Sequence, residues 1–441
     1  MDHSCFSVWP LVFRAGGGEA VIHIHAKYDH ARRQLAKVTH ARVFPVDGPV
    51  DPVAGPVWDL EASASMTRGE NGDLTLKTKL PVEDEYKILL QEKTGQGGGY
   101  ADYRSVAVFH VYAVADDLFA LKPFRGDFHM HSFNSDGRES AAYVAASCRK
   151  IGNDFMALTD HRNYAPSLEA RDRMASYDLD MKCYPGEEVH LPGNPVHIIN
   201  FGGNASANER AYGNLEAFEA EVAEREKEIR VDTDPLTLHQ LAMSEWAYDV
   251  IRESGGVAMF CHPYWRPGGH NYVGENLIDI MLERQKFDVL EVFGGFGRGD
   301  LESNLLSLMR YQEERAKGRN IPAAGVSDAH TCDGSFFGWY YTVVFAPTNG
   351  FADLRKALVS GDCVAVQAVP GSFPIAAGPY RLVKYVYFLL REYFPAHDEL
   401  CRIEGELVLR HLADSDDADA VRSLAARKGS VPALMKKLWA E

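Results

Sequence analysis

What this 441-residue sequence lacks narrows its class before any motif is considered. Its seven cysteines form no Cys-x-x-Cys pair, and its first residues have neither the basic nor the apolar segment of a signal peptide. The longest apolar run, around residues 385–390, is much too short to span a bilayer. We therefore expect reduced thiols, a cytoplasmic location and no membrane partner.

Basic residues are also scarce. The chain has 46 Lys and Arg residues against 62 Asp and Glu residues, which gives a formal net charge of −16. Because long nucleic acid is held mainly through its phosphates by Lys and Arg, this balance argues against binding of a long duplex. A small anionic substrate is compatible with an acidic chain, because bound metal ions can supply local positive charge.

The hydrophobic pattern divides the chain into three parts. Residues 1–120 have short alternating runs between Gly/Pro/Asp-rich turns, which predicts an all-β, sandwich-like accessory domain. Residues 121–375 alternate apolar strands with helices, the pattern of an α/β fold with parallel strands, and 202–245 are long enough for a helical cap over the site. Residues 376–441 predict a helical appendage. We expect any oligomer to form through the β domain or this appendage.

A His-x-His motif follows the first apolar run of the α/β part. His129 and His131 lie on one face of the predicted strand, because side chains alternate with period two. The polar turn that follows brings Asp136 back toward the same point. Two imidazoles and a carboxylate this close in sequence begin a metal site.

The same spacing occurs earlier in the chain without the same surroundings. His23 and His25 alternate on a predicted strand, and the only carboxylate close to them in sequence is Asp29. We interpret this pair as the half-exposed face of a strand, because imidazole spacing alone does not make a metal site.

Further histidines and carboxylates follow the later apolar runs. Each stands before a polar loop, and in folds built from parallel strands the carboxyl ends of the strands gather at one edge. The complete set is His129, His131, Asp136, His161, Glu188, His197, His262, Asp328 and His330.

Short motifs carry this set in order across residues 123–370. They are His129-Met-His131 with Asp136-Gly137, Thr159-Asp160-His161, Pro185-Gly186-Glu187-Glu188, His197-Ile-Ile, His262-Pro263 and Ser327-Asp328-Ala-His330. Their combination resembles the PHP (polymerase and histidinol phosphatase) family of metal-dependent phosphoesterases. The resemblance implies a distorted (β/α)7 barrel, seven strand-helix units, that holds two or three divalent metal ions.

The resemblance also implies how the ligands are shared. One ion would be held by His129, His131, Glu188 and Asp328. Glu188 would bridge to a second ion held also by His197 and His262, while Asp136, His161 and His330 would hold the third. A set of imidazoles and carboxylates without thiolates suits Mn, Fe or Zn.

Two ligand positions have competitors in the sequence. Glu187 and Glu188 point to opposite faces if their segment is a strand, and the Gly-x-Glu pattern of the family favours Glu188. His190 shares a face with Glu188 and competes with His197. The apolar residues that follow His197 fit the family pattern better.

The chemistry implied by the resemblance needs no side-chain nucleophile. Clustered divalent ions, held by groups such as Glu188 and Asp328, would lower the pKa of a bridging water to give the attacking hydroxide. In agreement, the sequence has no Gly-x-Ser-x-Gly elbow and no P-loop. Arg162 and Arg266 follow ligands into loops and are candidates to bind phosphate, with Arg298 as a third, although each also fits a surface arginine.

Two further acidic residues are predicted to support the ligands. Asp160, directly before His161, is expected to orient a ligand or a loop. Glu291 ends the predicted strand at 287–293 and either orients a ligand or bonds to the backbone. The sequence leaves both roles open for Glu291.

These observations predict a metal-dependent phosphoesterase that hydrolyses a small phosphorylated substrate, either a monoester or a short nucleotide or phosphodiester. One alternative is a metal-dependent C–N or C–O hydrolase of amidohydrolase type, against which stands the absence of an evident metal-bridging lysine at a strand end. Another is a non-catalytic binding or sensor protein that contains metal. The completeness of the ligand set argues against that reading, because structural sites seldom have several ions with open positions.

Overall fold

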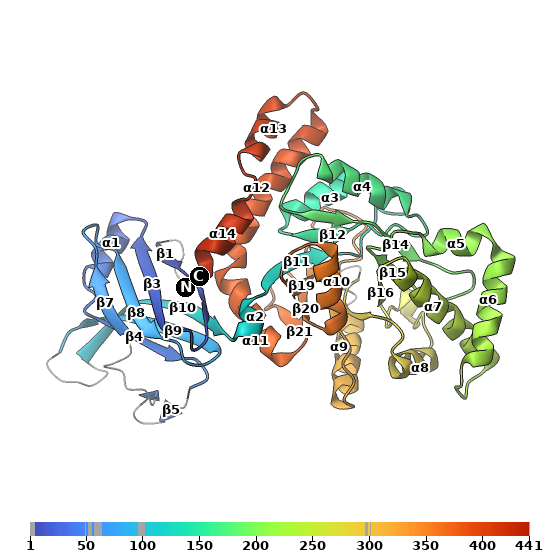
Figure 1. The fold of residues 1–441 in the computed structure, drawn as a ribbon, viewed down its shortest axis with the longest axis horizontal. Coiled ribbons are helices and arrows are strands. Elements are labelled where there is room, and N and C mark those ends of the chain that lie inside the picture. Colours follow the sequence, from blue (N-terminus) through green and yellow to red (C-terminus); the bar gives the residue numbers. More distant parts are fainter. Residues whose placement is uncertain are drawn as a thin grey trace. The chain divides into compact units, whose positions relative to one another are not determined.

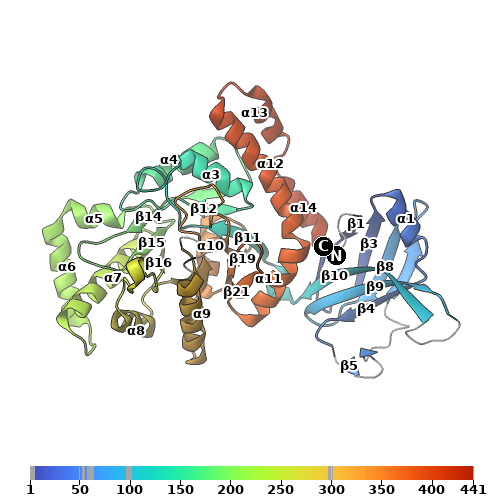
Figure 2. The ribbon, with the colours of Figure 1, turned by 180° about the vertical axis from the view of Figure 1, so that it is seen from behind.

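The computed structural model describes residues 5–48, 50–51, 55–56, 64–95, 102–295, 299, 301–334 and 336–440. The chain forms two compact units. The first contains Met1–Leu121, Tyr387–His397 and Ser430–Glu441, and the second contains Lys122–Val386 and Asp398–Gly429 (Figures 1 and 2). The segment after residue 376 is thus divided between the two units.

The first unit is built from two four-stranded sheets, with strand orders β1-β3-β8-β7 and β2-β10-β9-β4. Its main strands are β1 (Phe6–Trp9), β2 (Val12–Arg14), β3 (Glu19–Ala26), β4 (His40–Pro45), β7 (Ala64–Arg68), β8 (Leu74–Lys79), β9 (Asp84–Lys93) and β10 (Tyr103–Val114). The short strands β5 (Val50–Asp51) and β6 (Gly55–Pro56) pair with each other, and two short helices are α1 (Asp29–Leu35) and α2 (Asp116–Phe119). Alternate residues of β3 are buried, which explains its alternating sequence.

The second unit is a mixed α/β structure with two sheets. The six-stranded sheet has the order β13-β12-β11-β19-β20-β21, and the five-stranded sheet has the order β14-β15-β16-β17-β18. The strands are β11 (Lys122–Asp127), β12 (Phe155–Ala157), β13 (Lys182–Tyr184), β14 (Gly186–Val189), β15 (Ile198–Phe201), β16 (Val257–Phe260), β17 (Val289–Phe293), β18 (Ala323–Gly325), β19 (Tyr340–Ala346), β20 (Cys363–Gln367) and β21 (Ile375–Ala377).

This architecture differs from the predicted seven-stranded barrel. Within the described part of the chain neither sheet closes on itself, and several neighbouring strands are antiparallel, among them the pairs β14–β15, β15–β16 and β11–β19. One reason for the antiparallel pairing of β14 and β15 is the segment between Val189 and Ile198. This segment is too short to contain the crossover helix that a parallel connection needs.

Helices cover the outer sides of the two sheets. They are α3 (Ala141–Lys150), α4 (Ala165–Ala175), α5 (Ala207–Gly213), α6 (Leu215–Glu228), α7 (Pro235–Glu253), α8 (Glu275–Arg284), α9 (Leu301–Ala316) and α10 (Phe351–Ser360), with a short 3-10 helix at Pro267–Gly269. Helix α7 packs on β16, α9 on β17 and α10 on β19 (Figure 1). Helix α7 starts with Asp234 as its cap and a proline in its first turn, a strong start signal.

Helices follow β21. They are α11 (Tyr380–Glu392), α12 (Phe394–Ala413), α13 (Ala418–Ala425) and α14 (Ser430–Leu438). Among the described residues, no helix is both long enough and apolar enough to cross a membrane.

An apolar core between the two sheets brings the strand ends together. Phe128, Phe155 and Phe201 are fully buried in it, and the rings of Phe128 and Phe201 stack with centroids 4.7 Å apart. Phe128 directly precedes His129, and Val326 in the same core stands two residues before Asp328. The candidate ligands therefore emerge at one edge of this core.

Candidate metal centre

Glu188 on β14 lies at the centre of the candidate site and is fully buried. Imidazole nitrogens surround both of its oxygens. Oε2 lies 2.7 Å from His161 and 3.5 Å from both His129 and His131, while Oε1 lies 2.9 Å from His197, 3.2 Å from His190 and 3.3 Å from His262. A single carboxylate thus links every histidine of this edge except His330.

Glu187, next to Glu188, points to the opposite face. Its carboxylate accepts hydrogen bonds from the Ser206 hydroxyl, the Ala207 backbone N–H and the Asn208 amide at the start of α5. The alternation of a strand predicts this division, and it places Glu188 rather than Glu187 in the cluster.

The first and last ligand segments are joined by backbone hydrogen bonds. The Asp328 N–H donates to the His129 carbonyl at 2.7 Å, and the His131 N–H donates to the Ala329 carbonyl at 2.9 Å. As a result, Asp328 Oδ1 lies 2.8 Å from His131 Nε2 and 3.2 Å from His129 Nε2. With Glu188 these residues form one candidate metal group, all of it buried.

A second group surrounds Asp136. Asp136 Oδ1 lies 3.2 Å from His161 Nε2 and 3.3 Å from His330 Nε2, and the His131 ring stacks against both imidazoles. Asp160 fixes the turn that carries Asp136, because it accepts hydrogen bonds from the backbone and hydroxyl of Ser132 and from the Ser135 hydroxyl, at 2.6–2.7 Å. Asp160 therefore orients a loop beside the cluster.

His197 reaches the cluster by an unexpected route. It stands at the amino end of β15, whereas we predicted every ligand to follow the carboxyl end of a strand. Because β15 runs antiparallel to both β14 and β16, its amino end lies at the same edge as their carboxyl ends. His190 stacks on His197 with ring centroids 3.7 Å apart, so both competitors lie beside Glu188.

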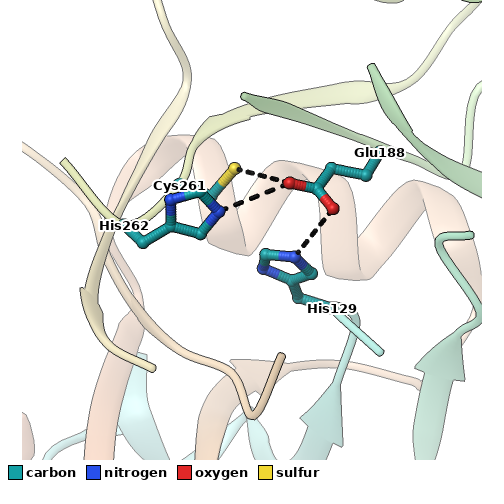
Figure 3. A group of neighbouring side chains, drawn as sticks. All are labelled: His129, Glu188, Cys261 and His262. Carbon is teal, nitrogen blue, oxygen red and sulfur yellow. Dashed lines mark hydrogen bonds and ion pairs between the residues drawn. The ribbon is translucent and has the colours of Figure 1, made fainter. Parts of the chain in front are cut away.

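A cysteine lies in the cluster, although we predicted a set without sulfur. Cys261 Sγ is 4.0 Å from Glu188 Oε1, and Cys261 forms a further candidate group with His129, Glu188 and His262 (Figure 3). Burial raises the pKa of the Cys261 thiol well above its ordinary value, and the nearby carboxylates add to this effect. The one signal in the sequence is that this cysteine directly precedes His262.

The arrangement fits divalent ions by two criteria. His129 Nε2, His131 Nδ1 and Glu188 Oε2 are buried and have no hydrogen-bond partner among the described residues. Two donors bound to one ion at about 2.1 Å in a tetrahedral site lie about 3.4 Å apart. The separations of 2.8–3.5 Å between the imidazoles of His129 and His131 and the carboxylates of Glu188 and Asp328 lie near that value.

The cluster binds protons unevenly. Burial disfavours a charged imidazole, but the carboxylates of Asp328 and Glu188 outweigh it and hold the pKa of His129 well above its usual range. In return, and against the effect of burial, His129 keeps the pKa of both carboxyls well below their usual range. Burial lowers the pKa of His131 and of His197 to about 4. The imidazole of His129 thus holds a proton that a bound cation would displace.

Two buried carboxylates support the ligands from behind. Glu291 on β17 has Oε2 3.0 Å from His129 Nδ1, which fixes the ring and leaves Nε2 directed at the cluster. This contact resolves the two roles left open for Glu291. Asp127 accepts hydrogen bonds from the backbone N–H groups of His129 and Ser327, and burial raises its pKa to about 7.

The cluster opens into a cavity of about 600 Å³. Its lining residues are Asn134, Ser135, Asp136, His161, Arg162, Glu188, His190, His197, His262, Trp265, Tyr272, Asp328 and His330. Of the described residues that line it, none is lysine and none comes from 202–245, the helical segment predicted to form a cap.

The rings of Trp265 and Tyr272 lie 4.8 Å apart and form an aromatic wall next to His197. No motif in the sequence indicates this wall.

The candidate arginines differ in their placement. Arg162 is exposed on the cavity wall, its backbone N–H donates to the Glu188 carbonyl, and no carboxylate in the described part of the chain pairs with its side chain. Arg266 bonds instead to Asn271 at 2.7 Å and to Glu302 at 2.8 Å. Arg298 lies outside the described residues.

No protein-family model matches the chain. Over 53 residues, which are 12% of this chain and 9% of the relative, the sequence is 43% identical to the DNA polymerase/3′-5′ exonuclease PolX of Bacillus subtilis. A similar solved structure is a two-domain protein from Bacteroides vulgatus that contains a predicted PHP-like metal-dependent phosphoesterase, with 18% identity and a TM-score of 0.38. That match covers 56% of this chain and 65% of the other.

Another similar structure is an amidohydrolase from Chromobacterium violaceum with bound sulfate and no metal. Its identity is 20% and its TM-score 0.32, and the match covers 48% of this chain and 89% of the other. This chain spans less than two thirds of the length of both PolX and the Bacteroides protein. The solved structures to which the chain is similar include proteins described as PHP-like metal-dependent phosphoesterases, the family that the motifs resemble.

Proposed function

We propose that the chain is a metal-dependent phosphoesterase that hydrolyses a small phosphorylated substrate, a monoester or a short nucleotide or phosphodiester. The observation that carries this proposal is the convergence of imidazoles on both oxygens of Glu188, with Asp328 and Asp136 on either side. We propose two or three divalent ions, of Mn, Fe or Zn, at this centre. Such ions, when bound, activate water and offset the negative charge that develops on a phosphoryl group.

The residues of the chain have separable roles in this proposal. His129, His131, Glu188 and Asp328 would hold cations at the buried end of the cavity, and Glu291 keeps the His129 ring in position. The buried strand ends exclude bulk water, which strengthens the interaction between a cation and its carboxylate ligands.

The walls of the cavity would select the substrate. Arg162 offers an exposed guanidinium beside the cluster, and a guanidinium matches phosphate oxygens in shape and charge. The faces of Trp265 and Tyr272 offer a surface on which a flat group of the substrate can pack. A cavity of about 600 Å³ suits a small molecule and not a long duplex, which agrees with the acidic chain.

The amidohydrolase alternative has less support at this site. The residues that line the described cavity include two carboxylates besides Glu188 and four imidazoles besides His197, but no lysine that could bridge two ions. The sensor alternative leaves unexplained why the cluster faces an open cavity with an arginine on its wall.

Hydrolysis of a panel of phosphomonoesters, phosphodiesters and short oligonucleotides in the presence of Mn tests the proposal. His131→Ala and Asp328→Ala are assayed beside the wild type. We expect phosphate release by the wild type that is lost in both variants, because each removes a donor of the buried group. Activity that survives both substitutions, or no activity on any ester from a protein that has bound metal, would overturn the proposal.

A further inference from the structure

Cys261 directly follows β16 and is 1% exposed, at the buried end of the cluster. Its sulfur and His262 Nε2 approach the same oxygen, Glu188 Oε1, at 4.0 Å and 3.3 Å (Figure 3). His129 approaches the other oxygen of Glu188 from the facing side. One donor atom from each of these four residues lies within 4.8 Å of the others.

The backbone explains how two consecutive side chains reach one carboxylate. Neighbouring side chains on a regular strand point to opposite faces, so Cys261 and His262 would normally diverge. The strand ends at Phe260, and His262 has a φ of 26°, in the left-handed region that residues other than glycine seldom adopt. Such local strain is typical of functional sites, and here it turns His262 toward the same point as Cys261.

A second observation points to a ligand at this place. His129 Nε2 and Glu188 Oε2 are fully buried and make no hydrogen bond of good geometry with the described residues. Oε2 nevertheless lies 2.7 Å from His161 Nδ1, and Nε2 lies 3.2 Å from Asp328 Oδ1. Buried donors that crowd together in this way beside a thiol, without good hydrogen bonds, are placed as ligands of one cation would be.

We propose that Cys261 is a thiolate ligand of the ion held by Glu188 and His262, with His129 beside it. This inference rests on the metal centre of the proposed function and extends it. Sulfur and oxygen donors on one tetrahedral zinc ion lie about 3.6 Å apart, for bonds of about 2.3 and 2.1 Å. The observed 4.0 Å is about 0.4 Å longer than this value. On binding, the thiol releases its proton to solvent as the sulfur–metal bond forms.

The consequence of this ligand is metal selection. Soft thiolate ligands favour Zn and Fe over Mn and Mg, which prefer oxygen donors. Two other buried thiols of the same unit donate to neutral atoms. Cys148 donates to Met130 Sδ at 3.2 Å, and Cys363 donates to the Ala323 carbonyl at 3.4 Å. Cys363 therefore provides a matched control, as a fully buried cysteine that belongs to no candidate metal group among the described residues.

The test is the absorption spectrum of the full-length protein loaded with Co²⁺. Cobalt bound to a thiolate has a near-ultraviolet sulfur-to-cobalt charge-transfer band that cobalt bound only to nitrogen and oxygen lacks. We expect the band in the wild type and in Cys363→Ala, and its loss in Cys261→Ala and Cys261→Ser. We also expect the Cys261 variants to bind Zn²⁺ at least about tenfold more weakly, with little change in the binding of Mn²⁺.

X-ray absorption spectroscopy of the zinc-loaded wild type tests the same ligand and does not depend on whether a variant folds. We expect a sulfur shell at about 2.3 Å. The inference would be overturned if cobalt binds without the charge-transfer band, or if the zinc shell contains no sulfur. Phosphate release by the same preparation would then show that the proposed function still holds. A protein that binds neither metal would overturn both.

Discussion

The chain contains two His-x-His motifs on strands, and their surroundings have little in common. His23 and His25 lie on β3, where His25 Nδ1 bonds to Asp73 at 2.9 Å and His23 Nδ1 to Thr75 at 3.3 Å. The His25 side chain is 40% exposed, whereas those of His129 and His131 are fully buried. Among the described residues, neither His23 nor His25 belongs to a candidate metal group.

The difference shows what spacing alone provides. Alternation along a strand aligns two imidazoles, but it does not bring the other ligands to them. At His25 the partner is Asp73, directly before the adjacent strand β8, and it satisfies the ring with one ion pair. At His131 the partners Glu188 and Asp328 come from strands far apart in the sequence, whose ends converge over a shared core.

The largest effect we expect separates these two motifs directly. His131→Ala removes a buried donor and should lower hydrolysis by about 10³-fold or more, because each catalytic ion supplies several kcal/mol of stabilisation. The matched variant His25→Ala should keep both metal content and turnover. Steady-state kinetics with elemental analysis of both proteins measures this. Equal losses in the two variants would contradict the distinction.

The pH dependence of metal binding follows from the buried histidines. Against the effect of burial, nearby carboxylates raise the pKa of His129, His161 and His262, so these rings hold protons that a cation must displace. Affinity for Zn²⁺ should therefore rise with pH by about tenfold per pH unit for each proton displaced, which is about a hundredfold from pH 6 to pH 8 if one proton is displaced and more if several are. Calorimetry in buffers of different ionisation enthalpy measures the released protons. An affinity that does not change with pH would contradict the assignment.

A smaller effect on metal binding is expected from Glu291, the carboxylate that holds the ring of His129 in position. Glu291→Ala removes the partner of His129 Nδ1 and should weaken metal binding by about 10- to 100-fold, because the ring is no longer held in position. Glu245, another buried carboxylate, pairs with Arg284, so Glu245→Gln is the matched control. Competition with a chelator measures both affinities. If Glu245→Gln weakens binding as much as Glu291→Ala, the effect reflects general stability.

The smallest effect concerns the two arginines. Arg162→Ala should lower kcat/KM for a phosphomonoester by about tenfold, which is modest because this guanidinium is exposed to solvent. Arg266 is already bonded to Asn271 and Glu302, so Arg266→Ala should change kcat/KM less than twofold. Steady-state kinetics of the two variants measures the difference. A larger loss in Arg266→Ala would reverse the assignment of the phosphate-binding residue.

Much of the centre could be predicted from local sequence rules. Alternation on a strand predicts that His129 and His131 share a face, and that Glu187 and Glu188 do not. The structure shows both. These predictions succeed because each depends on residues that are close in sequence, where geometry leaves few choices.

Features that depend on tertiary context were not predictable. The antiparallel direction of β15, which carries His197 to the cluster, is set by pairing with β14 and β16. The φ of His262 turns its ring toward the carboxylate that Cys261 also faces, and no rule for a regular strand gives that angle. Likewise, the partner of Arg266 lies at Glu302, and sequence distance gives no indication of that contact.

The central claim is that Glu188 joins several metal ligands into one hydrolytic centre. Elemental analysis of purified wild type, Glu188→Gln and Glu187→Gln tests it most directly, because the last two change adjacent buried carboxylates that face opposite ways. We expect two or three divalent ions per chain in the wild type and in Glu187→Gln, and loss of most of this metal, with hydrolysis, in Glu188→Gln. Full metal content in Glu188→Gln, or a wild type that binds no metal, would contradict the account.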